Sequence, residues 1–326
     1  MVAKNILEII GNTPIVELTH TNTGKCHLFI KLENQNPGGS IKDRVGLSMI
    51  NEAEKSGNIK PGDTIIEATA GNTGIGLALA ARMKGYKLIL VIPDKMSREK
   101  INHLRAMGVE IILTRSDVVK GDPEYYQDYA IRLSKERNAY YINQFENPAN
   151  PLAHEKTTGP EIWEQLEHHV DAVVVGVGSS GTLTGLTHFF KKVSPQTEFV
   201  LADPQGSMLA DYINKGVKNK ETGSWYVEGI GEDFVPVIAD FSLTHKAYSV
   251  SDQESFDAAR SLLMNEGILA GSSTGTLLSA AIRYCREQTE PKRVVTLACD
   301  SGNKYLSKMY NDDWMSEHGL ATKENK

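Results

Sequence analysis

Residues 64–93 read TIIEATAGNTGIGLALAARMKGYKLILVIP. The two ends of this stretch, 64–69 and 87–93, are short apolar runs rich in Ile, Leu and Val, which are typical of strands buried on both faces. Between them, a glycine-containing turn leads into small apolar residues that favour a helix. A strand, a helix and a strand in this order predict two parallel strands covered by a helix.

The same alternation of apolar runs and helical stretches continues along almost the whole chain and predicts an α/β fold. The candidate strands are 27–33, 64–69, 87–93, 110–114, 139–144, 171–178, 198–203, 247–250 and 293–299. These nine strands suit two mostly parallel sheets, each covered by helices on both faces as a three-layer αβα domain. Helices are expected at 43–56, before Gly57, and from a capping box at Ser251 and Glu254 to Gly267.

A break in this pattern at 147–151, where asparagine and proline recur, indicates a change of domain. We therefore expect a smaller domain over 41–146 and a larger one formed by 1–40 together with 147–326. The aperiodic stretch 215–223, rich in glycine and lysine, predicts a surface loop.

Composition excludes several classes of function. The chain has 326 residues, is 40% hydrophobic and carries a formal net charge of −6, so we expect a globular protein with neither nucleic acid nor a membrane as partner. No apolar run is long enough to span a membrane, and the N-terminus has no signal-peptide core. Cys26, Cys285 and Cys299 are too scattered for a disulfide framework, so we expect a cytoplasmic protein. His168 and His169 are adjacent and cannot share a helix face, so no catalytic metal is expected.

Four glycine-containing segments are candidates for chemistry, and the first is PGGSIKDR at 37–44. Gly38 and Gly39 permit the backbone to approach a flat ligand closely. Lys42 stands in the first turn of the expected helix and could form a Schiff base if it is shielded from water. The alternative is a plain loop with a solvated lysine.

The second segment, TAGNT at 69–73, ends a strand and begins a helix. Free backbone N–H groups at a helix N-terminus, together with Thr and Asn side chains, suit a carboxylate or a phosphate. The alternative is an N-capping turn whose glycines only allow close helix packing.

The third segment, GVGSSG at 176–181, has the spacing of a dinucleotide-binding fingerprint, and Asp203 ends the next strand 22 residues beyond Gly181. A nicotinamide-dependent oxidoreductase is therefore one interpretation. The same backbone geometry binds a lone phosphate monoester, so the motif indicates a phosphate and not the molecule that carries it.

The fourth segment, GSSTGT at 271–276, also precedes a helix. It is either a simple capping loop or a place where a serine hydroxyl hydrogen-bonds a ring nitrogen without protonating it.

Taken together, in this order and after IGNTP at 10–14, these segments resemble the fold type II pyridoxal-phosphate enzymes of the cysteine synthase and cystathionine β-synthase family. The resemblance implies that pyridoxal 5′-phosphate lies in a cleft between the two domains. It also implies that Lys42 forms the Schiff base with the cofactor and removes the Cα proton of the substrate.

The resemblance further implies how the other segments act. Asn72 would contact both the substrate and the cofactor's 3′-oxygen, Ser273 would face the pyridine nitrogen, and Gln144 would reach the substrate carboxylate. Ala70 stands where the family usually has serine, so one hydroxyl contact to the substrate is lost, and Ser180 replaces a glycine. The implied substrate-binding residues are Thr69, Ala70, Gly71, Asn72, Thr73, Gln144 and Gly229, and the implied phosphate cup is Gly178, Ser179, Ser180, Gly181 and Thr182.

The reaction that this resemblance implies is a β-replacement, in which L-serine or an activated serine condenses with homocysteine to cystathionine through an aminoacrylate intermediate. Segments 203–207, 227–234, 300–302 and 305–319 favour the cystathionine β-synthases of bacteria, without haem or a C-terminal regulatory module. Segments 67–76 and 157–163 fit the cysteine synthases equally well, which join O-acetylserine or O-phosphoserine to sulfide. A serine or threonine dehydratase is a further alternative, and a homodimer is expected.

Overall fold

The computed structural model describes residues 2–69, 71–94, 98–118, 121–217 and 222–322. Its backbone contacts divide the chain into two compact units: Met1–Gly11 with Asn36–Ala153, and Asn12–Gln35 with His154–Lys326. The first unit contains the whole of the expected smaller domain, 41–146, and adds the short segments on either side of it that the sequence pattern assigns to the larger domain.

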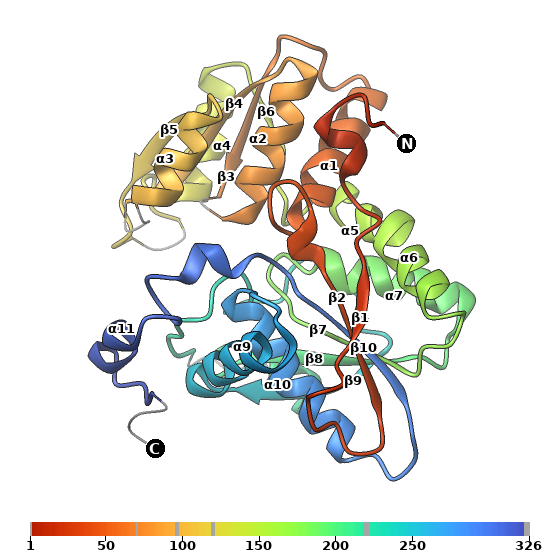
Figure 1. Ribbon diagram of the computed structural model, residues 1–326. Coiled ribbons are helices and arrows are strands. Elements are labelled where there is room, and N and C mark those ends of the chain that lie inside the picture. The colour runs from red at the N-terminus through yellow and green to blue at the C-terminus, as the bar shows by residue number, and fades with distance from the viewer. Residues whose placement is uncertain (1, 70, 95–97, 119–120, 218–221, 323–326) are drawn as a thin grey trace. The chain divides into compact units, whose positions relative to one another are not determined.

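The first unit is built on a four-stranded sheet of order β5-β4-β3-β6, in which all neighbouring strands are parallel (Figure 1). Its strands are β3 (Thr64–Ala68), β4 (Lys87–Pro93), β5 (Glu110–Thr114) and β6 (Tyr140–Tyr141). Its helices are η1 (Ile6–Ile9), α1 (Lys42–Lys55), α2 (Asn72–Lys84), α3 (Arg98–Ala106), α4 (Tyr126–Glu136) and α5 (Ala149–Ala153).

Alternation along the strands gives this sheet two buried faces. Ile65 and Leu90 belong to the apolar cluster that also holds side chains of α1, α2 and α3, whereas Ile66 and Val91 pack with side chains of α4. Successive strand residues point to opposite faces, so the helices cover both sides of the sheet. The first unit therefore has the expected three layers.

The second unit is built on a six-stranded sheet of order β1-β2-β10-β7-β8-β9. Its strands are β1 (Ile15–Glu17), β2 (His27–Lys31), β7 (Ala172–Val175), β8 (Glu198–Pro204), β9 (Thr244–Val250) and β10 (Arg293–Leu297). Its helices are η2 (Glu33–Gln35), the π-helix η3 (His154–Thr158), α6 (Gly159–Gln165), α7 (Gly181–Val193), α8 (Leu209–Lys215), α9 (Asp252–Glu266), α10 (Ser272–Arg286), η4 (Gly302–Tyr305) and α11 (Asp312–Glu317). Only the pair β1 and β2 is antiparallel among these strands.

Neighbouring residues of β8 show that this sheet is also covered on both faces. The ring of Phe199 packs against Phe190 of α7, with 5.8 Å between the centroids, whereas Glu198 accepts a hydrogen bond from the Tyr284 hydroxyl of α10 at 2.7 Å. Because adjacent strand residues point to opposite faces, α7 and α10 lie on opposite sides of the sheet.

All nine expected strands are present, and the α/β prediction with mostly parallel sheets is confirmed. The capping box is confirmed as well, since Ser251 accepts from the backbone N–H of Glu254 and α9 ends at Gly267 with a φ of 71°. The three-residue strand β1 was not predicted, because it is too short to show an alternating pattern. Within 147–151, where the sequence pattern breaks, α5 begins at Ala149, and Pro151 is tolerated in its first turn, where no N–H is needed.

Two glycines let α1 and α2 cross at unusually close range. A Cβ on Gly46 would lie 2.6 Å from the carbonyl oxygen of Gly76, and a Cβ on Gly76 would overlap the carbonyl oxygen of Lys42. Real Cβ atoms do not approach backbone atoms so closely, so only glycine fits at both positions. The crossing brings the first turn of α1, with Lys42, against the first turns of α2.

Substituting Gly76 by Ala tests this crossing. The new methyl group would overlap the backbone of Lys42, so we expect the free energy of unfolding, measured by urea denaturation, to fall by about 1–3 kcal/mol. Gly74→Ala is the matched control, because it lies in the same helix and its nearest neighbour, Leu90 Cδ1 at 2.8 Å, ends a side chain that can move. Equal losses in the two variants would contradict this account.

Candidate active site

Lys42 is the first residue of α1 and is half-buried. Its backbone N–H donates to Ser40 Oγ at 3.2 Å, and the buried carboxylate of Asp43 accepts from the backbone N–H of Gly38 at 2.5 Å. A Cβ on Gly38 would overlap that carboxylate, so the glycine permits the contact. The loop before Lys42 is thus fixed from both sides, which gives the lysine a defined position.

The turn between β3 and α2 carries the residues expected to bind the substrate carboxylate. Gly71 donates its N–H to Thr69 Oγ1 at 3.2 Å, and the Thr73 hydroxyl donates to Gln144 Oε1 at 2.8 Å. Because Oε1 of Gln144 accepts this bond, the Nε2 group of the same amide is left as a donor. The structure therefore brings Thr69, Gly71, Asn72, Thr73 and Gln144 together in the first unit, whereas Ala70 lies outside the described residues.

The expected phosphate cup lies in the second unit, where β7 leads into α7. The carbonyl oxygen of Gly229 would lie 2.6 Å from a Cβ on Gly178, and Gly231 donates its N–H to Val177 O at 2.8 Å. Among the described residues, no acceptor is seen for the backbone N–H groups of Gly178, Ser180, Gly181 and Thr182. A loop of free N–H groups at a helix N-terminus fits a phosphate.

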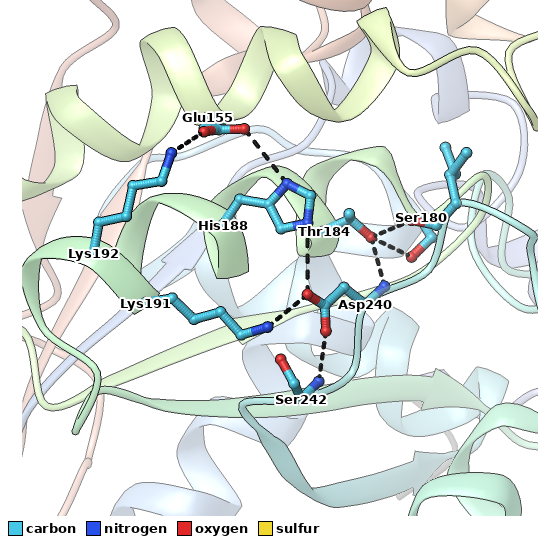
Figure 2. A network of polar contacts seen from close by, with 9 residues as sticks. Glu155, Ser180, Thr184, His188, Lys191, Lys192, Asp240 and Ser242 are labelled. Carbon is cyan, nitrogen blue, oxygen red and sulfur yellow. Dashed lines mark hydrogen bonds and ion pairs between the residues drawn. The ribbon is translucent and has the colours of Figure 1, made fainter.

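Ser180, which replaces the usual glycine, is accommodated by the helix behind it. Its backbone is left-handed, with a φ of 70°, and its hydroxyl lies 3.2 Å from Thr184 Oγ1 (Figure 2). Thr184 in turn donates to Ile238 O at 2.9 Å and accepts from Asp240 N at 3.0 Å. The cup is thereby tied to the segment around Asp240.

Ser273 is the second residue of α10 and is 5% exposed. No hydrogen-bond partner of its hydroxyl is seen within the described part of the chain. This hydroxyl can therefore donate to a ligand, and an unprotonated ring nitrogen would accept its hydrogen bond. The neighbouring Ser272 instead accepts from the backbone N–H of Glu228 at 3.0 Å.

His154 is a site residue that sequence reasoning missed. It is fully buried in the π-helix η3, and its Nε2 lies 3.3 Å from Thr182 Oγ1 at the cup, while its Nδ1 lies 2.9 Å from Thr158 Oγ1. A single histidine without a spaced partner carries no signal in the sequence, so only the fold reveals its contact with Thr182. The contact of Nδ1 with Thr158 fixes the imidazole ring, and its Nε2 holds the Thr182 hydroxyl in place.

Asp203 is not available to a ribose in the way that the dinucleotide interpretation requires. The side chain is fully buried and accepts from the backbone N–H of Ala210 in α8 at 2.8 Å. Burial, opposed by hydrogen bonds from Ser207 and α8, raises the pKa of Asp203 to about 6. The carboxylate thus stabilises the start of a helix within its own unit.

The described residues lack two further kinds of feature. They hold no cluster of three or more His, Cys, Asp or Glu side chains arranged for a metal ion. Their helices also include none with the length and apolar character needed to cross a membrane.

A charged network continues from the cup along α7 (Figure 2). His188 lies between Glu155 at 3.4 Å and Asp240 at 3.5 Å, and Lys191 donates to Asp240 at 2.8 Å. Burial tends to raise the pKa of Asp240, but hydrogen bonds from Lys191 and Ser242 outweigh it and lower the pKa to about 2. The ionised carboxylate therefore helps to hold the segment that Thr184 binds.

Two variants of Ser180 separate the effect of its hydroxyl bond from the effect of its left-handed backbone. Ser180→Ala loses the hydroxyl bond and keeps the left-handed backbone, so we expect the free energy of unfolding to fall by about 1 kcal/mol in urea denaturation. Ser180→Gly loses the same bond but removes the backbone strain of about 1–2 kcal/mol, so it should be at least as stable as the wild type. A glycine variant less stable than the alanine variant would contradict this.

Replacing Asp240 by Asn should have a pH-dependent effect. The folded pKa lies below the unfolded value of 3.8, so the stabilisation is complete above that value and is lost as the pH falls from 3.8 to about 2. At about pH 6, Asp240→Asn should lower the free energy of unfolding by about 1 kcal/mol, a value reduced by the partial exposure of the pair. The difference from the wild type should shrink at about pH 3, and a constant difference would contradict the assignment.

Comparison with known proteins agrees with this geometry. The model of the family described as pyridoxal-phosphate dependent enzyme matches residues 6–300. Cystathionine beta-synthase of Mus musculus is 42% identical over 99% of this chain and 58% of its own length, and that of Saccharomyces cerevisiae is 41% identical over 97% and 64%. The chain thus spans about three fifths of these curated relatives.

Two solved structures are similar throughout. A hydrogen sulfide-producing enzyme from Fusobacterium nucleatum has a TM-score of 0.86 and 38% identity, covering 94% of this chain and all 100% of its own. O-ureido-L-serine synthase has a TM-score of 0.88 and 32% identity, covering 97% of this chain and 100% of its own. The match over residues 6–300 and the likeness to these structures show that the chain belongs to the pyridoxal-phosphate dependent enzymes, in their fold type II form.

Proposed function

We propose that this chain catalyses a β-replacement in which L-serine and homocysteine form cystathionine and water. The observation that carries the proposal is the 41–42% identity, across 97–100% of this chain, to proteins named cystathionine beta-synthase. The matched length includes the segments that hold Lys42, Gln144, the cup and Ser273. The activity is proposed for these 326 residues, which correspond to about three fifths of the length of those relatives.

Pyridoxal phosphate, when bound, supplies an electron sink for the negative charge left at the substrate Cα. The residues of this chain fit such a group. The free N–H groups of Gly178, Ser180 and Gly181 suit its phosphate, and the unpartnered Ser273 hydroxyl suits its pyridine nitrogen. A neutral serine leaves that nitrogen without a proton, which favours elimination and replacement over transamination.

In this proposal Lys42 holds the cofactor covalently and moves the proton at the substrate Cα. The substrate carboxylate is bound by Thr73, Asn72 and the Nε2 donor of Gln144, next to the N-terminus of α2. Because α1 and α2 cross at Gly46 and Gly76, the lysine and these donors are held at neighbouring helix starts. When the substrate carboxylate is fixed at this place, the Cα–H bond of the substrate is oriented towards Lys42.

A second candidate is a cysteine synthase, which would join O-acetylserine or O-phosphoserine to sulfide. It is favoured by the names of the two solved structures, a hydrogen sulfide-producing enzyme and a synthase of a serine derivative. Both candidates use the same residues up to the entry of the second substrate. The choice between them lies in the leaving group and the thiol.

We also propose that the protein acts in the cytoplasm and as a homodimer. Its three cysteines, Cys26, Cys285 and Cys299, are thiols and not disulfides, which suits a reducing compartment. The homodimer follows from the resemblance to the family.

Replacing Lys42 by Ala should lower cystathionine formation from L-serine and homocysteine by at least about a thousand-fold, because both the covalent anchor and the base are lost. The purified variant should also lose the cofactor's visible absorbance. Lys55→Ala is the matched control, since Lys55 ends the same helix with a side chain that is 73% exposed. Retention of most activity by the Lys42 variant would refute the assignment.

The two candidate reactions are separated with the wild-type protein. Turnover of L-serine with homocysteine supports the first, and turnover confined to O-acetylserine with sulfide supports the second. Absence of a visible cofactor band after addition of pyridoxal phosphate would overturn both.

A further inference from the structure

Glu67 is a fully buried carboxylate at the end of β3. Its Oε1 accepts the backbone N–H of Ala68 at 2.8 Å, and its Oε2 accepts the backbone N–H of Gln144 at 3.0 Å. Within the described residues, no Lys, Arg or His side chain pairs with it. Such a group is costly to bury, so its presence requires an explanation.

The sheet explains why two donors meet there. The strand β6 ends at Tyr141, and the last bond of its ladder runs from the Ile142 N–H to Ile66 O at 3.0 Å. Asn143 then takes a left-handed conformation, with a φ of 48°, which turns the chain away from β3. Gln144 therefore reaches the carboxylate of Glu67 where a regular strand would have reached a backbone carbonyl.

Three polar groups of Gln144 have hydrogen-bond partners: the backbone N–H, the backbone carbonyl and the side-chain oxygen. Its N–H donates to Glu67, its carbonyl accepts from Asn150 Nδ2 at 2.8 Å, and its side-chain oxygen accepts from Thr73 at 2.8 Å. Glu67 itself lies two residues before Thr69, at the start of the carboxylate-binding turn. One carboxylate thus joins the two segments that supply donors to the substrate carboxylate.

A neutral side chain would not do the same. A carboxylate presents two acceptor oxygens, whereas the amide of glutamine presents one acceptor and one donor, and the donor would face an N–H group. Burial raises the pKa of Glu67 to about 7, while the two backbone hydrogen bonds oppose that rise. The two backbone N–H donors therefore stabilise the ionised form of Glu67 at this buried position.

We infer that Glu67 is a positioning residue, which sets the orientation of Gln144 against Thr73 and thereby the affinity for the carboxylate of the amino-acid substrate. Glu67 acts through Gln144 and does not touch the substrate. The inference rests on the proposed function.

Glu67→Gln tests it by steady-state kinetics. The KM for the amino-acid substrate should rise about tenfold, because the carboxylate donors lose their alignment. The KM for the thiol and the visible absorbance of the cofactor should not change. Glu146→Gln is the matched control: Glu146 is exposed, lies two residues from Gln144, and its carboxylate accepts from Asn143 Nδ2 at 3.0 Å. It should leave both KM values unchanged.

Glu67→Asp is a second, milder variant that tests the inference even if Glu67→Gln does not fold. It keeps both oxygens on a stem shorter by one methylene, so its KM for the amino acid should lie between those of the wild type and Glu67→Gln. Equal KM values for the amino acid in the wild type and in a folded Glu67 variant would overturn the inference, as would a parallel rise in the KM for the thiol.

Hydrogen exchange gives a readout that does not depend on activity. In the protein without substrate, the Gln144 amide should exchange at least about tenfold faster in Glu67→Gln than in the wild type, while the amides of β4 keep their rates. Unchanged protection of Gln144 would overturn the inference. A different outcome would reject only the proposed function: the wild type neither binds pyridoxal phosphate nor responds to an amino acid, yet Gln144 exchanges faster in Glu67→Gln than in the wild type. The link between Glu67 and Gln144 would then stand.

Discussion

The candidate site depends on helix N-termini whose first backbone N–H groups have no side-chain cap. The helices α2, α7 and α10 begin after Gly71, Ser180 and Gly271, and none of these residues caps its helix through a side chain. By contrast, α9 begins with a complete capping box at Ser251. Where no side chain satisfies the first N–H groups, a ligand with negative charge can do so. The starts of α2 and α7 follow the ends of the parallel strands β3 and β7, which is where α/β folds bind ligands.

Buried carboxylates complete the backbone where regular structure stops. Asp43 accepts the N–H of Gly38 before α1, Glu67 accepts that of Gln144 beyond β6, and Asp203 accepts that of Ala210 in α8. Each replaces a partner that a strand or helix would have provided. Irregular segments can therefore stay buried and rigid, which a binding loop needs if its donors are to be aligned before the substrate arrives.

Ser180 and Asp203 both bear on how the third glycine segment binds a phosphate. Ser180 has a left-handed backbone, which glycine also adopts readily, and directs its hydroxyl towards Thr184, so the cup's N–H groups remain available. The Asp203 side chain is engaged by α8, and the third glycine segment consequently belongs with a phosphate monoester rather than with a dinucleotide. The family match over residues 6–300 agrees with that choice.

The sequence by itself determined the alternation of strands and helices and the glycine segments beside Lys42, Thr73, Ser180 and Ser273, because turn chemistry and apolar periodicity act over a few residues. It determined the family by the order of those segments. Only the tertiary structure decided that Gly46 meets Gly76, that His154 reaches Thr182, and that Glu67 holds Gln144, 77 residues further along the chain. These contacts depend on which strands become neighbours and on where each strand ends, and local preference along the chain carries no record of either.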